Sequence, residues 1–189
     1  MARARHEAKR RALTAESLEN AALHYLGRFA SSSANLRRIL LRKVARAAPE
    51  GDEGAGPKLV ENLIARYLAR GLLDDRAYAA QAAASLARRG TSRFAIAGKL
   101  AQKGVSHELI EETLEGLGER GGEIAAACAL VRRRRLGPYR APGSRAEWRR
   151  KDLASLARAG FGLEVARRVL AARDVDALDA LARSEEEGA

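Results

Sequence analysis

The chain of 189 residues is poor in several residue types, and each shortage excludes a class of protein. A single cysteine, Cys128, excludes an intramolecular disulfide and suits a reducing compartment. Aromatic residues make up only 4% of the chain, so its core must be assembled from smaller side chains. No apolar run approaches the roughly 20 residues that cross a bilayer, and the basic N-terminus lacks the apolar segment of a secretory signal. We therefore expect a cytoplasmic protein without a membrane partner.

The chain also lacks the residue patterns of catalytic and metal sites. The histidines stand far apart and share no ligand-like spacing with the cysteine or with acids. No glycine-rich loop is present that could cradle a phosphate. Asp74 and Asp75 are adjacent carboxylates, but acids at a helix start more often serve as the N-cap and as a first-turn charge. We therefore expect no catalytic residues, no cofactor and no metal, and we interpret Asp74 and Asp75 as structural caps.

Helix-forming residues are abundant. Alanine and leucine supply most of the 47% apolar residues, both are strong helix formers, and no stretch alternates in the manner of a strand. Three similar stretches, starting at Leu40, Leu100 and Leu156, each place a basic and then an apolar residue after the leucine, which is typical of a helix end. This recurrence predicts an all-α fold: a tandem array of three three-helix units, elongated and open to curvature.

Breaks in the helical periodicity divide the chain. We predict a flexible basic arm over residues 1–13 and a weakly patterned end over residues 174–189, which is either a short helix or an acidic C-terminal tail. Between them lie the three predicted three-helix units, which cover residues 14–73 with a loop at 48–57, residues 74–119, and residues 120–173 with a loop at 136–145.

The formal charge of +11 favours nucleic acid or another anionic partner, although an excess of arginine can also reflect coding bias. The four arginines Arg132–Arg135 either form a solvated helix end or bind a phosphate or acidic partner. The cluster Arg149–Lys151 follows Trp148, which can stack on a base or pack into a small core. We expect the loop between these two clusters to unite them in one electropositive surface. The candidate binding residues are Arg37, Arg38, Arg42, Lys43, Lys103, Arg132, Arg133, Arg134, Arg135, Trp148, Arg149, Arg150, Lys151 and Arg158.

Two segments carry a resemblance to a known family. The segment Asp74–Ala79, followed by Gly90, Leu100 and Lys103–Val105, resembles the RecX family of RecA regulators, and Lys151–Phe161 is similar to its closing motif. The resemblance covers roughly residues 18–170. It implies a cytoplasmic protein of tandem three-helix units that binds RecA, lodges in the groove of the RecA–DNA filament and usually inhibits the recombinase. It also implies no catalytic residues and no cofactor.

The chain departs from that family in one helix and at one cap. Ser32 and Asn35 stand where the family tends to have a serine–glutamate capping box, so the reciprocal glutamate contact is missing. Gly98 lies in the middle of a predicted helix, where glycine is unfavourable. Phe94, Ala95 and Ala97 occupy a stretch that is often more basic in the family, which argues against contact between this helix and DNA.

We therefore predict a monomeric regulatory protein whose partners are RecA, the RecA–DNA filament, and single- and double-stranded DNA. Two alternatives stay open: a general helical nucleic-acid-binding protein that does not need RecA, and a non-catalytic helical interaction scaffold. Binding to RecA-coated DNA separates the first prediction from both alternatives. Binding to bare DNA with a steep salt dependence separates the general nucleic-acid-binding protein from the interaction scaffold.

Overall fold

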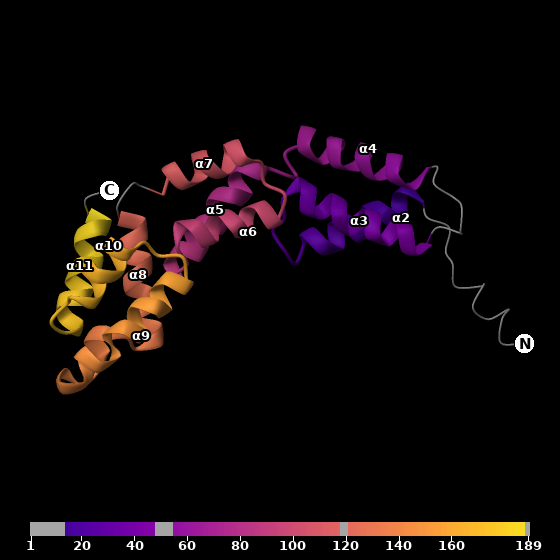
Figure 1. Cartoon of the computed structure of the whole chain (residues 1–189). Coiled ribbons are helices and arrows are strands. Elements are labelled where there is room, and N and C mark those ends of the chain that lie inside the picture. The colour runs from indigo at the N-terminus through magenta and orange to yellow at the C-terminus, as the bar shows by residue number, and fades with distance from the viewer. Residues whose placement is uncertain (1–13, 48–54, 118–120, 188–189) are drawn as a thin grey trace, which may run out of the picture. The chain divides into compact units, whose positions relative to one another are not determined.

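The computed structural model describes residues 14–47, 55–117 and 121–187, and every regular element in these ranges is a helix (Figure 1). The predicted all-α fold is confirmed. The predicted basic arm and residues 48–54 of the first predicted loop lie outside the described residues. The α-helices are α2 (Ala15–Leu26), α3 (Ser33–Ala47), α4 (Gly56–Ala69), α5 (Asp75–Arg88), α6 (Arg93–Gln102), α7 (His107–Glu115), α8 (Gly121–Arg134), α9 (Arg145–Arg158), α10 (Leu163–Leu170) and α11 (Val175–Glu187).

The chain folds as two compact units, residues 1–78 and 79–189, and the division falls within α5. The second compact unit contains the third predicted unit and all of the second except residues 74–78, so the division into three stays a prediction. In the first unit, α2, α3 and α4 pack around one core. Leu36, Leu40 and Val44 recur every four residues on α3 and are all buried, as expected for the inner face of an amphipathic helix.

A carboxylate from a later helix, α5, caps the N-terminus of α3. Asp74 is the N-cap of α5, because its Oδ1 accepts the Ala77 N–H at 2.9 Å. Asp75 lies in the first turn of α5, but its two oxygens accept the N–H of Ser33 at 2.7 Å and the hydroxyl of Ser33 at 2.6 Å. Asp75 is thus a first-turn acid of α5 whose carboxylate stabilises the start of α3.

The second unit uses the same arrangement. Ser92 caps α6 by accepting the Ala95 N–H, and the next N–H, that of Arg93, donates to Glu123 Oε2 at 2.9 Å. Glu123 lies in the first turn of α8. Burial raises the pKa of Glu123 above its usual value, and the hydrogen bond from the Arg93 N–H opposes that rise. In both places an acid from a later helix binds the first N–H of an earlier one.

Two of the three similar stretches end helices as predicted. The Val105 N–H bonds back to the Leu100 carbonyl at 3.1 Å, and the Phe161 N–H bonds back to Leu156 at 3.1 Å. The intervening glycines, Gly104 and Gly160, have φ of 76° and 86°, the left-handed conformation that glycine adopts without strain. The predicted helix end after Leu40 is wrong, because α3 continues to Ala47.

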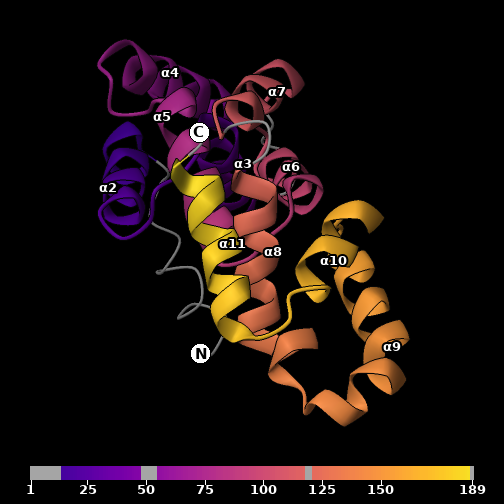
Figure 2. The same ribbon diagram turned by 90° about the vertical axis from the view of Figure 1, so that its left-hand side faces the viewer.

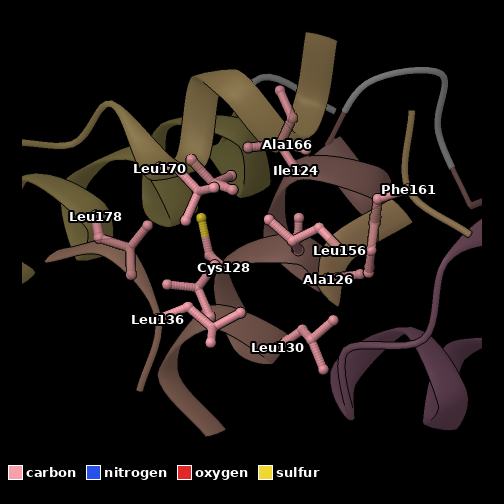
Figure 3. Packing of buried hydrophobic residues seen from close by; sticks show 13 residues of the cluster. Ile124, Ala126, Cys128, Leu130, Leu136, Leu156, Phe161, Ala166, Leu170 and Leu178 are labelled. Atoms are coloured by element: carbon pink, nitrogen blue, oxygen red, sulfur yellow. The ribbon is translucent and has the colours of Figure 1, made fainter. Parts of the chain in front are cut away.

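The core of the second unit lies among α8, α9, α10 and α11 (Figure 3). Cys128 is 1% exposed and packs there as the small buried side chain that the sequence suggested. Helix α11 lies alongside α8 (Figure 2), and its Leu178 is completely buried. Of the two alternatives for residues 174–189, the helix is therefore correct for 175–187, and an acidic tail does not describe these residues.

The connection between α8 and α9, predicted as a loop over residues 136–145, contains two short 3-10 helices. These are η1 (Gly137–Tyr139) and η2 (Pro142–Ser144), each with a proline among its first two residues. Leu136, Gly137 and Pro138 are buried. The connection is thus a structured hairpin that fixes how α9 leaves α8.

Candidate nucleic-acid interface

The consecutive arginines at the end of α8 reach four different elements, since neighbouring residues on a helix point in different directions. Arg132 pairs with Asp179 of α11, Arg133 donates to the carbonyl of Arg89 at 2.6 Å, Arg134 donates to Ser155 Oγ of α9 at 2.8 Å, and the Arg135 guanidinium lies over the Tyr139 ring at 5.1 Å. We expected this run and the cluster Arg149–Lys151 to form one surface. The side chains of the run instead point to different elements. Arg134 is the member that reaches α9.

A buried ion pair holds the hairpin between α8 and α9. Arg140 donates to both carboxylate oxygens of Asp152, at 2.8 Å and 2.6 Å, and the Gly137 N–H donates to the same carboxylate at 2.9 Å. The side chain of Asp152 is 3% exposed and that of Arg140 is 22% exposed. Burial alone would raise the pKa of Asp152, but the bonds from Arg140 and Gly137 outweigh it, so the pKa lies below its usual value.

Neither this pair nor Arg145, a second arginine that supports it, was predicted from the sequence. Arg145 donates to the carbonyls of Pro138, Arg140 and Arg173, and so ties the hairpin to the connection between α10 and α11. The available signal was Asp152, an acid four residues before the buried Leu156 and hence on the inner side of α9. An acid in that position requires a cationic partner.

Trp148 is half-buried and lies beside two cations. The Arg140 guanidinium and the Lys151 ammonium are each 4.3 Å from the centre of its ring, a distance at which the cations are attracted to the ring face. Trp148 does not belong to the hydrophobic core of the described part of the second unit. The indole thus packs against two cations at a basic surface, and its stacking on a base stays a prediction.

Helix α9 arranges several candidates on one face. Trp148, Lys151, Ser155 and Arg158 follow one another at spacings of three, four and three residues, which places them along one side of the helix. Ser155 holds the Arg134 side chain on that side. We call Arg134, Trp148, Lys151 and Arg158 the α9 basic face. At about 1.5 Å per residue it extends about 15 Å, the rise of four to five nucleotides of one strand at about 3.4 Å each.

The other candidates of the second unit lie off this face. Arg149 lines a pocket of about 500 Å³ at the start of α9, together with Arg145 and Arg173. Arg150 is exposed and, from helical geometry, points about 100° away from Lys151. Lys103 is exposed at the end of α6.

The first unit carries its own basic helix, because α3 contains arginine and lysine but no acid. Arg37 forms an ion pair with Glu61 of α4 at 2.9 Å, and Arg38 donates to Asn35 at 2.8 Å. Arg42 and Lys43 are exposed on the outer side of α3. This helix is a second candidate for phosphate contact.

Features of other protein classes are not found in the described ranges. Within residues 14–47, 55–117 and 121–187, none of the helices combines the length and the apolar character that a membrane crossing requires. In the same ranges, no three His, Cys, Asp or Glu side chains gather as ligands of a metal ion would.

Comparisons with known proteins give one consistent result. A family model described as RecX, second three-helix domain, matches residues 74–114, which hold α5, α6 and α7 up to Leu114. "Regulatory protein RecX" of Myxococcus xanthus is 44% identical over 156 residues, which are 81% of this chain and 83% of that protein. Proteins of the same name from Agrobacterium fabrum and Halorhodospira halophila are 33% and 32% identical, over 86% and 85% of this chain and 86% and 91% of those proteins. No solved structure matches the chain. At this identity and coverage, the chain belongs to the RecX family.

Proposed function

We propose that this chain is a non-catalytic, monomeric, cytoplasmic regulator that binds RecA and the RecA–DNA filament and inhibits the recombinase and ATPase activities of RecA. The observation that carries the proposal is the match to relatives named Regulatory protein RecX over more than four fifths of the chain. The RecA partner follows from the resemblance of Asp74–Ala79 and Lys151–Phe161 to a family of RecA regulators. The role belongs to DNA repair and recombination.

The α9 basic face supports the DNA part of the proposal. Three cations along one side of a helix suit a line of phosphates, because each phosphate contact releases condensed counterions. Trp148 lies among them and offers an aromatic surface to an unstacked base. The face therefore suits the backbone of a single strand or of a filament better than it suits sequence-specific reading, which needs contacts with base edges.

An inhibitor of this kind acts with few molecules. A protein that binds at a growing filament end blocks the addition of RecA protomers, whereas a competitor for free DNA has to cover the strand. We predict that the full chain slows DNA-dependent ATP hydrolysis by RecA at well below one molecule per RecA protomer. The measurement is ATP hydrolysis on single-stranded DNA, titrated with the chain.

The same titration separates the alternatives. Unchanged hydrolysis up to an equimolar amount of the chain would count against a RecA regulator. If the chain then still binds bare DNA with a steep salt dependence, it is a general nucleic-acid-binding protein. Inhibition that appears only when the chain is abundant enough to cover the DNA would indicate competition for the strand.

A further inference from the structure

The second unit has an apolar groove beside the α9 basic face, and the two share Arg158. The groove has a volume of about 780 Å³ and lies between α6 and α7, with the end of α9 at one side. It is lined by Ala97, Gly98 and Ala101 of α6 and by Ile110 and Leu114 of α7. We call it the α6–α7 groove.

Phe94 stands at the edge of this groove with its side chain in solvent. It is 78% exposed, more than any of the other large exposed hydrophobic residues of the described ranges. One edge of its ring packs against Gly160, because a Cβ added at Gly160 would meet Phe94 Cδ1 at 3.2 Å. An exposed aromatic side chain beside an apolar hollow is the usual form of a protein-binding site.

Small residues keep the groove open. A Cβ at Gly98 would meet no atom within 4 Å, so no neighbouring side chain requires a glycine at this position. Glycine inside a helix is unfavourable compared with alanine, and the fold around Gly98 offers no compensation for that cost. The absence of side-chain volume leaves room for another segment to approach the backbone of α6.

The charges at the groove indicate what that segment carries. Lys99 and Arg158 line the groove, and neither has an ion-pair partner among the residues that the structure describes. On the α7 side, Glu111 already contacts His107 at 3.5 Å. The lining therefore carries two basic side chains, Lys99 and Arg158, against one acid, Glu111. A nucleic acid fits less well, because the lining of the groove is mostly apolar.

We propose that the α6–α7 groove binds an acidic amphipathic segment of RecA, with an apolar side chain against Phe94 and a carboxylate facing Lys99 and Arg158. The inference rests on the proposed function, since it takes RecA as the partner. It adds that RecA contacts the groove and DNA contacts the α9 basic face, and that Arg158 lies where these two neighbouring surfaces meet.

The test uses the full chain in two groove variants. Phe94→Ala removes the aromatic contact, and Gly98→Leu fills the groove with a residue that favours a helix more than glycine does. The control is Phe29→Ala, which removes a phenylalanine that is 53% exposed in the first unit. For each protein, we would measure the affinity for DNA-free RecA, the affinity for bare single-stranded DNA, the melting temperature and the sedimentation of the chain alone.

We expect both groove variants to bind RecA about tenfold or more weakly, with wild-type DNA affinity and unchanged or higher melting temperature, while the control matches wild type. If both variants bind RecA as tightly as wild type, RecA does not bind in the groove, and the proposed function is unaffected. No binding of RecA by the wild-type chain would overturn both. Loss of DNA affinity in Phe94→Ala would show a base-stacking residue. A wild-type dimer that Phe94→Ala dissociates would show a second copy in the groove. Either result overturns the RecA segment as occupant.

Discussion

Asp152 is the residue on which the hairpin between α8 and α9 depends most. The residue is 2% exposed, and its carboxylate accepts hydrogen bonds from the guanidinium of Arg140 and the backbone of Gly137. A buried charge without its partners is far more costly than an exposed one. The same Arg140 lies against Trp148, so a residue of the interior positions an aromatic side chain of the proposed DNA surface.

We predict that Asp152→Asn lowers the free energy of unfolding by about 1–3 kcal/mol at pH 7, the range for loss of hydrogen bonds to a charged group. The lowered pKa gives the pH dependence, because a carboxyl that is harder to protonate when folded stabilises the fold above its unfolded value of 3.8. That contribution is lost as the pH falls from 3.8 through the lower pKa of the folded state. The difference between wild type and variant should therefore be constant from pH 7 to 5 and shrink below pH 4.

Urea unfolding at pH 7, 5 and 3 measures this difference. The matched control is Glu61→Gln, which removes a carboxylate whose pair with Arg37 is exposed, at 51% and 42% of the two side chains. Exposed pairs contribute less than about 1 kcal/mol. A difference that stays the same down to pH 3 would show that the charge of Asp152 is not what stabilises the hairpin.

At the scale of helices, the chain fastens one element to another by carboxylates at helix starts. Asp75 binds Ser33 at the start of α3, and Glu123 binds Arg93 at the start of α6. In each case the acid comes from a helix later in the chain. The first N–H groups of a helix have no partner within it, so a carboxylate that supplies one also fixes where the two helices meet.

We predict that Asp75→Ala destabilises the first unit by about 1–3 kcal/mol, because two hydrogen bonds to a charged group are lost. Asp74→Ala removes an ordinary cap and should cost about 0.5–2 kcal/mol. The decisive measurement is a double-mutant cycle by urea unfolding, with Ser33→Ala as the second change. Coupling of about 1 kcal/mol is expected for Asp75 with Ser33 and none for Asp74 with Ser33. Simple additivity for Asp75 would show that it does not act through Ser33.

Features that depend on residues close together in the sequence were predicted best. The helix ends at Gly104 and Gly160 follow from residues within one turn, because the bonds that close them join positions five apart. The stretch after Leu40 has similar letters but no glycine, and the alanines and arginine that follow favour continuation of α3. The packing of α11 on α8 could not be predicted, since Leu178 is a single buried leucine in an acidic segment and its partner is far away in sequence.

The basic surface was predictable in composition but not in arrangement. The run Arg132–Arg135 and the cluster Arg149–Lys151 are evident in the sequence, and both lie where helices end or begin. Which arginines remain available is decided by neighbours from other elements: Asp179 takes Arg132, and Ser155 turns Arg134 toward α9. Tertiary contacts therefore select one face of α9 out of a generally basic chain.

At the scale of the whole molecule, the formal charge of +11 attracts any polyanion, so affinity alone does not locate the DNA contact. The salt dependence of binding does, because each phosphate contact contributes roughly 0.7 to the slope of log K against log salt for a single strand. A set of charges that contacts DNA must flatten this slope when it is removed. A set of equal size that only solvates the surface must leave it nearly unchanged.

The last prediction compares two triple variants of the full chain. The test variant has alanine in place of Arg134, Lys151 and Arg158. It should bind single-stranded DNA more weakly, and its slope of log K against log salt should be flatter by about 2, because three contacts of roughly 0.7 each are lost. The control variant has alanine in place of Arg150, Arg167 and Arg183, which are exposed and lie off the α9 basic face. It loses the same charge, and its salt slope should equal that of wild type within error. Both variants should melt near wild type, because exposed substitutions usually change stability by less than about 0.5 kcal/mol. Equal slopes for the two variants would exclude the α9 basic face as the contact. The next candidate would then be α3, with Arg37, Arg38, Arg42 and Lys43.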